Sequence, residues 1–279
     1  MTVRVAGVPD RVTEAEDRVA IVTGAARGIG ASTATALARQ HWRLVLFDRC
    51  ADDPALDYPL ATPEELDAVV LACGGSDGRA IGVVGDVRDQ GALDAAVATA
   101  TERFGQLDAA VAAAGCIAGG DPAWTTSEAL WSTMISVNLE GVWRLARAAV
   151  PALLARPVPR DGRLVAISSA GGSVGLPLLS AYVAAKHGIN GLVRSLAAEL
   201  GPQGITANAV APGSTTTAML TASSAVYDLP DTDGLILQHL LERALHPDEV
   251  AALVAWVCSP ASSGVTGAIL PVDAGMTAQ

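Results

Sequence analysis

Aromatic residues and lysine are both scarce in this chain of 279 residues. Phe, Tyr and Trp together make up 4% of it, and lysine occurs once, at position 186, against 17 arginines. The core must therefore be built from Ala, Val, Leu and Ile, as is typical of parallel strands buried on both faces. A net charge of −11 without a basic cluster argues against nucleic acid or an anionic membrane surface as a partner.

Several signals of other protein classes are also missing. The histidines do not cluster with cysteines or carboxylates at metal-ligand spacing, so no bound metal is expected. No apolar run approaches the roughly 18–20 residues that cross a bilayer, and no signal peptide is recognisable. The cysteines form no C-x-x-C pair, which fits a reducing compartment and predicts a cytoplasmic protein; they are Cys50, Cys73, Cys116 and Cys258.

Short apolar runs alternate with amphipathic stretches along the chain. Seven runs are predicted to be strands, at 19–23, 43–48, 80–84, 107–113, 163–169, 205–211 and 268–272. Helices are expected between them, at 28–41, 63–73, 89–104, 127–156 in two segments, 181–200 and 247–258. The alternation predicts one α/β domain over 18–279, a doubly wound, Rossmann-type parallel sheet of seven strands with helices on both faces.

Three segments depart from this minimal pattern. Residues 1–17 precede the first strand and are expected to form an arm. Residues 49–62 make a Pro- and Asp-rich connection where a few residues usually suffice. Residues 214–246 follow a strand end, where open α/β sheets bind ligands, and are rich in apolar residues. They are expected to form a lid over an apolar substrate, unless they pack on their own helix or a neighbouring subunit.

A glycine-rich turn joins the first predicted strand to the first predicted helix, with the sequence Thr23-Gly24-Ala25-Ala26-Arg27-Gly28-Ile29-Gly30. Glycines at this place let the backbone approach a pyrophosphate, whose charge meets the helix N-terminus. Glycines also simply end strands, but the position between strand and helix favours dinucleotide binding.

Asp48 ends the second predicted strand, 18 residues beyond Gly30. A carboxylate there can accept hydrogen bonds from an adenosine ribose and would repel a 2′-phosphate, which favours NAD over NADP. Arg27 and Arg49 lie where they could favour such a phosphate instead, and Asp48 could be only a capping residue.

Asp86 and Val87 follow the third predicted strand and could reach the adenine. Asp86 could equally be the N-cap of the next helix.

Tyr182 and Lys186 lie four residues apart near the start of a predicted helix. Residues at this spacing share a helix face, so the phenol and the ammonium project into the same space. A free Tyr has a pKa of about 10, and a neighbouring cation lowers it. Such spacing usually means a surface pair, but this pair contains the chain's one lysine. We therefore predict a proton-transfer centre.

On these motifs the chain resembles the short-chain dehydrogenase/reductase family. The glycine turn matches the family's TGxxxGxG, and the Tyr–Lys pair matches its YxxxK. The resemblance covers essentially the whole chain and includes Val137-Asn138-Leu139, Ser169, Pro212-Gly213 with Thr215 and Thr217, Val265-Thr266-Gly267, and Val272-Asp273-Ala274-Gly275.

The resemblance implies an NAD-dependent enzyme that interconverts a secondary alcohol and a ketone. Tyr182 would take or give the proton of the substrate hydroxyl, and Ser169 would hold the substrate oxygen. Lys186 would bind the nicotinamide ribose and lower the pKa of Tyr182. Ser168 rivals Ser169, because the sequence reads Ser-Ser and only the family spacing selects the second.

The same resemblance assigns further residues. Asn138 would support a water that links Lys186 to solvent, although it could be an ordinary polar helix residue. The nicotinamide pocket would be shaped by Pro212, Gly213, Thr215 and Thr217. Ala112-Ala113-Ala114-Gly115 departs from the family's Asn-Asn-Ala-Gly, which removes an Asn contact but leaves Ala114 and Gly115 beside the cofactor.

The insertion at 49–62 narrows the resemblance. With Ala112–Gly120, Pro212–Leu220 and Tyr227–Pro230, it is similar to an actinobacterial subgroup associated with the redox peptide mycofactocin, which includes carveol-dehydrogenase-like enzymes. This likeness implies that the insertion covers the adenosine side, that bound NAD exchanges poorly, and that electrons pass to an external acceptor. Helices 127–156 and 181–200 resemble the family's oligomer faces and imply a homotetramer.

One rival function uses the same fold. A non-catalytic dinucleotide sensor would need the glycine turn and Asp48, but not Ser169, Tyr182 and Lys186 together. An epimerase or dehydratase of the related, longer family would carry a larger C-terminal domain than this length allows.

Overall fold

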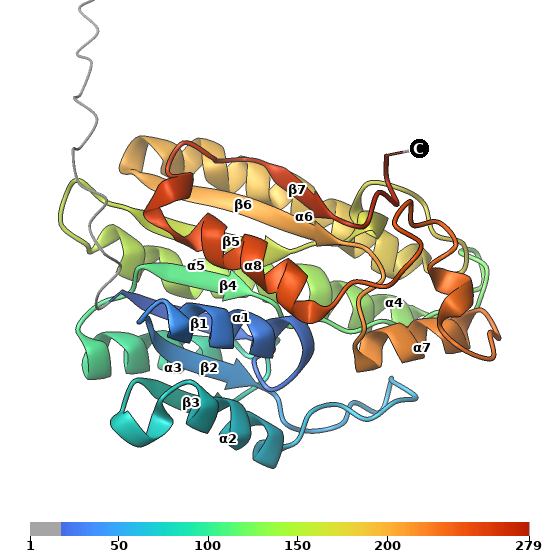
Figure 1. Ribbon diagram of the computed structural model, residues 1–279, viewed down its shortest axis with the longest axis horizontal. Helices are drawn as coiled ribbons and strands as arrows, with labels where there is room; N and C mark the ends of the chain where they lie inside the picture. Colours follow the sequence, from blue (N-terminus) through green and yellow to red (C-terminus); the bar gives the residue numbers. More distant parts are fainter. Residues whose placement is uncertain (1–17, 279) are drawn as a thin grey trace, which may run out of the picture.

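The computed structural model describes residues 18–278 and contains a seven-stranded sheet (Figure 1). The predicted arm at 1–17 lies outside the described residues. All strand pairs are parallel, in the order β3-β2-β1-β4-β5-β6-β7. The strands are β1 Val19–Thr23, β2 Arg43–Asp48, β3 Ala80–Val84, β4 Ala109–Ala112, β5 Gly162–Ile167, β6 Ile205–Pro212 and β7 Ile269–Val272.

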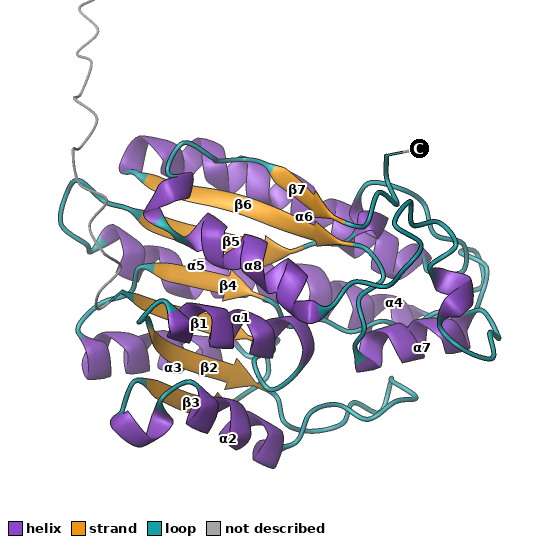
Figure 2. Ribbon diagram, viewed as in Figure 1, coloured by secondary structure: helices purple, strands orange, loops and turns teal. Residues whose placement is uncertain are grey.

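Eight α-helices connect and flank the strands within the described chain (Figure 2). They are α1 Gly28–Arg39, α2 Pro63–Ala72, α3 Gln90–Phe104, α4 Glu128–Ile135, α5 Gly141–Leu154, α6 Ser180–Leu200, α7 Ala218–Val226 and α8 Pro247–Cys258. A π-helical turn, Ser136–Glu140, joins α4 to α5. Short 3₁₀ turns cover Gly75–Asp77, Ala170–Gly172, Gly201–Gln203, Asp233–Leu235 and Pro260–Ser262.

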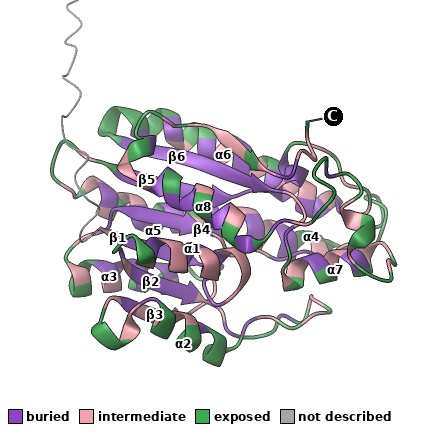
Figure 3. Cartoon of the chain, viewed as in Figure 1, coloured by how far each residue is buried: buried purple, intermediate pink, exposed green. Residues whose placement is uncertain are grey.

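The sheet is covered on both faces, as its composition requires. Alternate strand residues such as Val19 and Ile21 pack with α3, α5 and α6, whereas Ala20 and Val22 pack with α1, α2 and α8. The strands β1, β4, β5 and β6 are buried along their whole length, while the edge strands β3 and β7 are partly exposed (Figure 3). The doubly wound prediction is therefore confirmed.

The prediction differs from the structure mainly at element ends. The predicted strands 107–113 and 163–169 are shorter in the structure, because Ala113, Ser168 and Ser169 leave the sheet to line a cavity. The predicted helical stretch 127–156 is divided by the π turn. Within 214–246 only α7 and one 3₁₀ turn are helical.

The strand order reverses direction between β1 and β4. The chain proceeds from β1 to β2 and β3 on one side, and returns to β4 on the other. The helices that follow β1 and β4 lie on opposite faces of the sheet, so the two connections separate beyond the strand ends and leave a crevice there. The described residues contain no helix with the length and apolarity to cross a membrane.

Candidate active site

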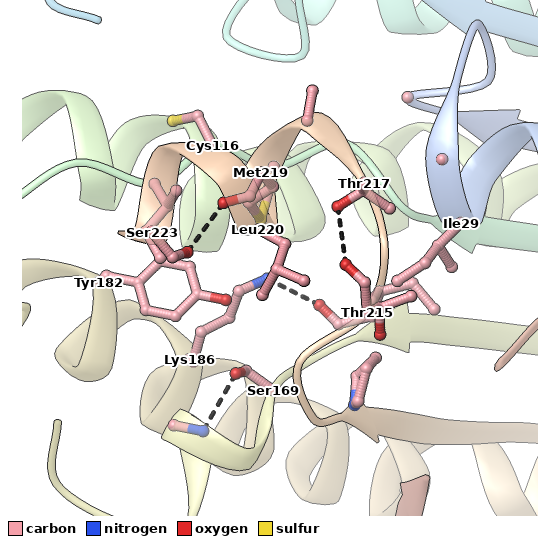
Figure 4. A pocket seen from close by; sticks show the side chains of 18 of the residues that line it. Ile29, Cys116, Ser169, Tyr182, Lys186, Thr215, Thr217, Met219, Leu220 and Ser223 are labelled. Atoms are coloured by element: carbon pink, nitrogen blue, oxygen red, sulfur yellow. Dashed lines mark hydrogen bonds between the residues drawn. The ribbon is translucent and has the colours of Figure 1, made fainter. Parts of the chain in front are cut away.

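A cavity of about 600 Å³ lies at the carboxyl ends of the strands. Its walls come from the turn after β1, the segments after β2 to β6, the N-terminal part of α6, and α7. Figure 4 shows Tyr182, Lys186 and Ser169 on one side of it, with Met219 and Leu220 of α7 close by. Apart from Asn138, every predicted catalytic or cofactor residue lines this cavity.

The glycine turn between β1 and α1 cannot carry larger residues. Gly24 has a φ of +66°, and a Cβ on it would lie 2.6 Å from the Ala114 Cα. A Cβ on Gly30 would lie 2.0 Å from the Gly24 carbonyl oxygen. The backbones after β1 and β4 are thus in direct contact, and Arg27, Gly28 and Ile29 begin α1 at the cavity. A helix N-terminus in this place suits an anionic ligand.

Asp48 combines the two roles that its sequence position left open. Its Oδ2 accepts a hydrogen bond from the Ala26 N–H at 3.0 Å, and its Oδ1 accepts one from the Cys50 N–H at 3.2 Å. It therefore caps two turns. The carboxylate also lines the cavity, so a ligand lying on the glycine turn meets its negative charge.

Asp86 is not the N-cap of α3, because Asp89 has that role and accepts hydrogen bonds from Gly91 and Ala92. Asp86 instead accepts hydrogen bonds from the Arg88 side chain through both oxygens, and its Oδ2 lies 3.4 Å from the Arg49 Nε. Val87 is buried beside it and lines the same wall.

Residues 49–62 are held in place by ion pairs and by hydrogen bonds to other walls of the cavity. Asp53 is 4% exposed and pairs with Arg49 at 2.5 Å and Arg88 at 2.9 Å. The Arg27 side chain donates to the Pro59 carbonyl at 2.8 Å, and the Tyr58 hydroxyl accepts from the Ile117 N–H at 3.0 Å. The segment therefore runs along the cavity, which Leu56, Tyr58 and Leu60 line.

Tyr182 and Lys186 lie on the buried face of α6 and point into the cavity (Figure 4). They are 5% and 4% exposed. The Lys186 Nζ donates to the Ile167 carbonyl at the end of β5 at 2.9 Å, and lies 5.6 Å from the centre of the Tyr182 ring. The i, i+4 spacing thus brings the phenol and the cation together as expected.

Burial dominates the protonation of both groups. It raises the pKa of Tyr182 to about 12, although a hydrogen bond with Ser169 acts to lower it. It also lowers the pKa of Lys186 to about 8, which the Cys116 thiol partly opposes. The sequence predicts that Lys186 lowers the pKa of Tyr182, but among the protein's own groups burial outweighs this and the pKa is raised. The proton sits more firmly on the phenol, and less firmly on the amine, than in water.

The two adjacent serines occupy different environments. The Ser168 hydroxyl is buried and donates to the Asn190 Oδ1 at 2.8 Å, which joins β5 to α6. The Ser169 hydroxyl accepts from the Gly171 N–H at 3.0 Å and lies near enough to Tyr182 to act on the pKa of the phenol. Ser169 is thus the serine beside the phenol, the one that the family spacing selected.

Asn138 is fully buried in the π turn and does not reach the cavity wall. Its Oδ1 accepts from the Cys116 N–H at 3.1 Å, and its Nδ2 donates to the carbonyls of Cys116 and Met134. A Cβ on Gly115 would lie 2.9 Å from the Asn138 Oδ1 and 3.7 Å from the Lys186 Nζ. Asn138 therefore fixes the loop that passes over Lys186.

The loop after β6 forms the wall on the α7 side. A Cβ on Gly213 would lie 2.9 Å from the Asp273 Cα, so this backbone is packed against the C-terminal segment. Hydroxyl groups close the turn, since Thr215 donates to the Gly213 carbonyl. Thr217 likewise donates to the Thr215 carbonyl (Figure 4). Pro212, Gly213, Thr215 and Thr217 all line the cavity.

Sequence reasoning missed several residues of the cavity wall. Tyr58 and Leu56 were seen only as parts of an insertion, and Cys116 only as a scattered thiol. Burial raises the pKa of Cys116 to about 12. A usable signal existed for Tyr58, because it is one of just three tyrosines.

Within residues 18–278, no group of three or more His, Cys, Asp or Glu side chains is arranged to hold a metal ion.

Fold and site together define a dinucleotide-binding oxidoreductase of the α/β type, and comparison with known proteins names the family. A family model described as enoyl-(acyl carrier protein) reductase matches residues 24–277. The (−)-trans-carveol dehydrogenase of Rhodococcus erythropolis is 35% identical over 274 residues, which cover 94% of this chain and 98% of that protein. An uncharacterized NAD-dependent oxidoreductase of Mycobacterium tuberculosis is 35% identical over 264 residues, 92% of this chain and 95% of that one.

Among solved structures, the carveol dehydrogenase from Mycobacterium avium in complex with NAD matches with a TM-score of 0.90. It is 36% identical, and the match covers 95% of this chain and 99% of that one. The chain therefore belongs to the short-chain dehydrogenase/reductase family.

The buried lysine generates a prediction about stability. Because Lys186 has a pKa of about 8 in the fold and 10.5 ordinarily, the unfolded chain binds more protons between these pH values. The contribution of Lys186 to stability should rise across this window by about 3 kcal/mol at most, against an opposite contribution from the buried thiols, whose pKa values burial raises. Unfolding in urea at pH 7.5, 8.5 and 9.5 measures this rise. Lys186→Met should remove it, since the other titrating groups are common to both proteins. Parallel pH profiles for the two proteins would contradict the assignment.

Proposed function

We propose that this protein is an NAD-dependent oxidoreductase that interconverts a secondary alcohol and a ketone with a small, apolar skeleton. One observation carries the proposal: a phenol and an ammonium are buried together, beside a serine hydroxyl, in the cavity that begins at the glycine turn. A sensor needs the glycine turn and Asp48 but not these three groups, and in a sensor a buried lysine would be a cost without a use.

The residues at the glycine turn fit a dinucleotide. Gly24 lies against the Ala114 backbone, and the start of α1 lines the cavity directly. Gly24, Arg27, Gly28, Ile29 and Gly30 would hold the pyrophosphate, with Asp48, Asp86 and Val87 toward the adenosine. Lys186 and Tyr182 would bind the nicotinamide ribose, between Ala114 and Gly115 on one side and Pro212, Gly213, Thr215 and Thr217 on the other. When bound, NAD supplies the acceptor or donor of the hydride.

The chain's own residues handle the proton. Ser169 holds the substrate oxygen against the Tyr182 hydroxyl. In oxidation the Tyr182 oxygen takes the hydroxyl proton of the alcohol, and in reduction it returns a proton to the carbonyl oxygen. Burial opposes the phenolate, so the Ser169 hydrogen bond and the Lys186 cation must favour it. Asn138 is a positioning residue that holds the Cys116 backbone beside Lys186, and it would support a water that links Lys186 to solvent.

The charges around Asp48 favour NAD over NADP. The two arginines that could attract a 2′-phosphate are already engaged, Arg27 by the Pro59 carbonyl and Arg49 by Asp53 and Asp86. Asp48 remains as a carboxylate at hydrogen-bonding distance from the turn. A phosphate placed there would meet a negative charge with little compensation.

The substrate side of the cavity is apolar. Tyr182 packs in a cluster with Cys116, Ile117, Met134 and Leu179. The α7 residues Met219, Ala222 and Val226 pack against the same cluster, which supports 214–246 as a substrate lid rather than a separate packing element. The likeness to two proteins named as carveol dehydrogenases agrees with an alcohol on a hydrocarbon skeleton.

The anchored segment 49–62 supports slow cofactor exchange. Its bonds from Arg27 to Pro59 and from Ile117 to Tyr58 would have to break before a nucleotide beneath it could leave. With the subgroup likeness, this favours transfer of electrons to an external acceptor such as mycofactocin.

Exposed Trp131 on α4 and Trp143 on α5 support a homotetramer through these helices, and we propose a cytoplasmic location.

The role of Asp48 is tested by two substitutions. Asp48→Ser should relax or reverse the preference for NAD over NADP, because the repulsion of a 2′-phosphate is lost. Asp48→Asn keeps the shape and the acceptor oxygen, so it separates charge from turn geometry. Affinities of both variants for the two nucleotides are measured by calorimetry. An unchanged NAD/NADP ratio in both would contradict the assignment.

The reaction itself is tested by a screen of secondary alcohols. Oxidation is followed through the absorbance of bound NADH and, in parallel, with an artificial electron acceptor. We expect apolar cyclic alcohols to be oxidised by the wild type, and Lys186→Arg to lose at least about a hundredfold in activity, because the bulkier guanidinium cannot make the same contacts.

Nucleotide content and turnover separate the rival proposals. No signal from any alcohol or ketone, with NAD still bound, would favour the sensor. Wild-type turnover in Lys186→Arg would overturn the role of the pair. If desalting readily yields nucleotide-free protein that turns over rapidly with added NAD, slow exchange is wrong while the oxidoreductase activity stands.

A further inference from the structure

All three tyrosines of the chain line the same cavity, although aromatic residues make up 4% of the sequence. Tyr58 comes from the insertion, Tyr182 from α6, and Tyr227 from the end of α7. Apolar side chains would suffice to wall a purely hydrocarbon chamber. The three phenol hydroxyl groups in this cavity therefore require separate explanations.

The hydroxyl groups of these tyrosines are used differently. Tyr182 is the proposed acid and base. Tyr227 donates its proton to the Pro177 carbonyl at 3.0 Å, so its hydroxyl holds the lid. Tyr58 accepts from the Ile117 N–H at 3.0 Å, and its own proton meets no acceptor among residues 18–278. A phenol both accepts and donates, so Tyr58 keeps one donor for a ligand.

The position of Tyr58 indicates which ligand receives that donor. Leu56 and Tyr58 pack against the apolar cluster around Cys116 and Tyr182, which contains no residue of the glycine turn. Ile117, whose N–H donates to the Tyr58 hydroxyl, belongs to this cluster. In Figure 1 the insertion extends toward α7, which contributes Met219 and Val226 to the same packing. Tyr58 thus lies on the substrate side of the cavity.

Tyr58 is also held in place and stays protonated. Neighbouring Pro59 is fixed by Arg27, and Asp53, earlier in the segment, is buried between Arg49 and Arg88. Burial raises the pKa of Tyr58 to about 12, so the hydroxyl remains a donor at neutral pH. A donor fixed before the ligand binds adds to specificity, because little freedom is lost on binding.

We propose that Tyr58 is a specificity-determining residue, whose hydroxyl, held by Ile117, donates a hydrogen bond to a second oxygen on an otherwise apolar alcohol or ketone. The preferred substrates are then diketones, hydroxyketones or diols, with one oxygen at Tyr182 and Ser169 and the other at Tyr58. This inference rests on the proposed function for the first of these two oxygens.

The test compares isosteric ligands in matched variants. Cyclohexane-1,4-dione is compared with 4-methylidenecyclohexanone, in which a =CH2 group replaces one carbonyl oxygen. A decalin dione is compared with its own methylidene ketone, to cover a larger distance between the two oxygens. Binding to the protein saturated with NAD, which holds no hydride to transfer, is measured by calorimetry. Wild type should bind at least one dione roughly tenfold more tightly than its partner. Tyr58→Phe should abolish this preference.

Tyr227→Phe is the matched control, since it removes a hydroxyl of the same cavity whose proton is already engaged. It should retain the preference, as both substitutions keep the ring. Absence of any preference in wild type, or its persistence in Tyr58→Phe, would overturn the proposal. So would an equal loss for dione and monoketone, which would mean that Tyr58 only shapes the wall. Because binding is measured without turnover, failure of the alcohol screen remains a separate result.

Discussion

The buried ammonium of Lys186 is the constraint around which the site is organised. A charge that is 4% exposed, with one backbone carbonyl as its hydrogen-bond acceptor, is costly to a fold, as its lowered pKa reflects. The acceptor is the Ile167 carbonyl at the end of β5, so the position of Lys186 depends directly on the sheet. The cost is reasonable only if the charge acts on something in the cavity. The neighbouring Tyr182 phenol, whose ionisation burial opposes, is the group that such a charge would assist.

Two covering segments act together above this pair. The insertion after β2 reaches the cluster around Tyr182 through Leu56 and Tyr58, and α7 reaches it through Met219 and Val226. The wall over the cofactor end and the wall over the substrate end therefore share one apolar cluster. A change in either segment should therefore alter this shared cluster, which would couple the proposed cofactor retention to the proposed substrate choice.

The sequence was most informative where local chemistry decides the structure. Strands such as Val19–Thr23 follow from continuous apolar runs, and the glycine turn follows from a backbone contact that a Cβ would prevent. It was less informative where several local solutions exist. The sequence left Asp86 as either an adenine contact or an N-cap, and only the fold shows that Asp89 caps α3 while Asp86 binds Arg88. The contact between Tyr58 and Ile117 joins residues 59 positions apart, and no periodicity encodes it.

The scarcity of lysine has a physical explanation at the one position that keeps it. Gly115 passes so close that a Cβ there would lie 3.7 Å from the Lys186 Nζ, and Asn138 holds that backbone through Cys116. A planar guanidinium needs more space and several acceptors, whereas this site offers the Ile167 carbonyl on the protein side. An ammonium also has a pKa that burial can bring to about 8, close to neutrality, while a guanidinium stays charged. Arg163 is equally buried, but it finds acceptors in the Gly162 and Ser259 carbonyls, so a guanidinium is accommodated there and not beside Gly115.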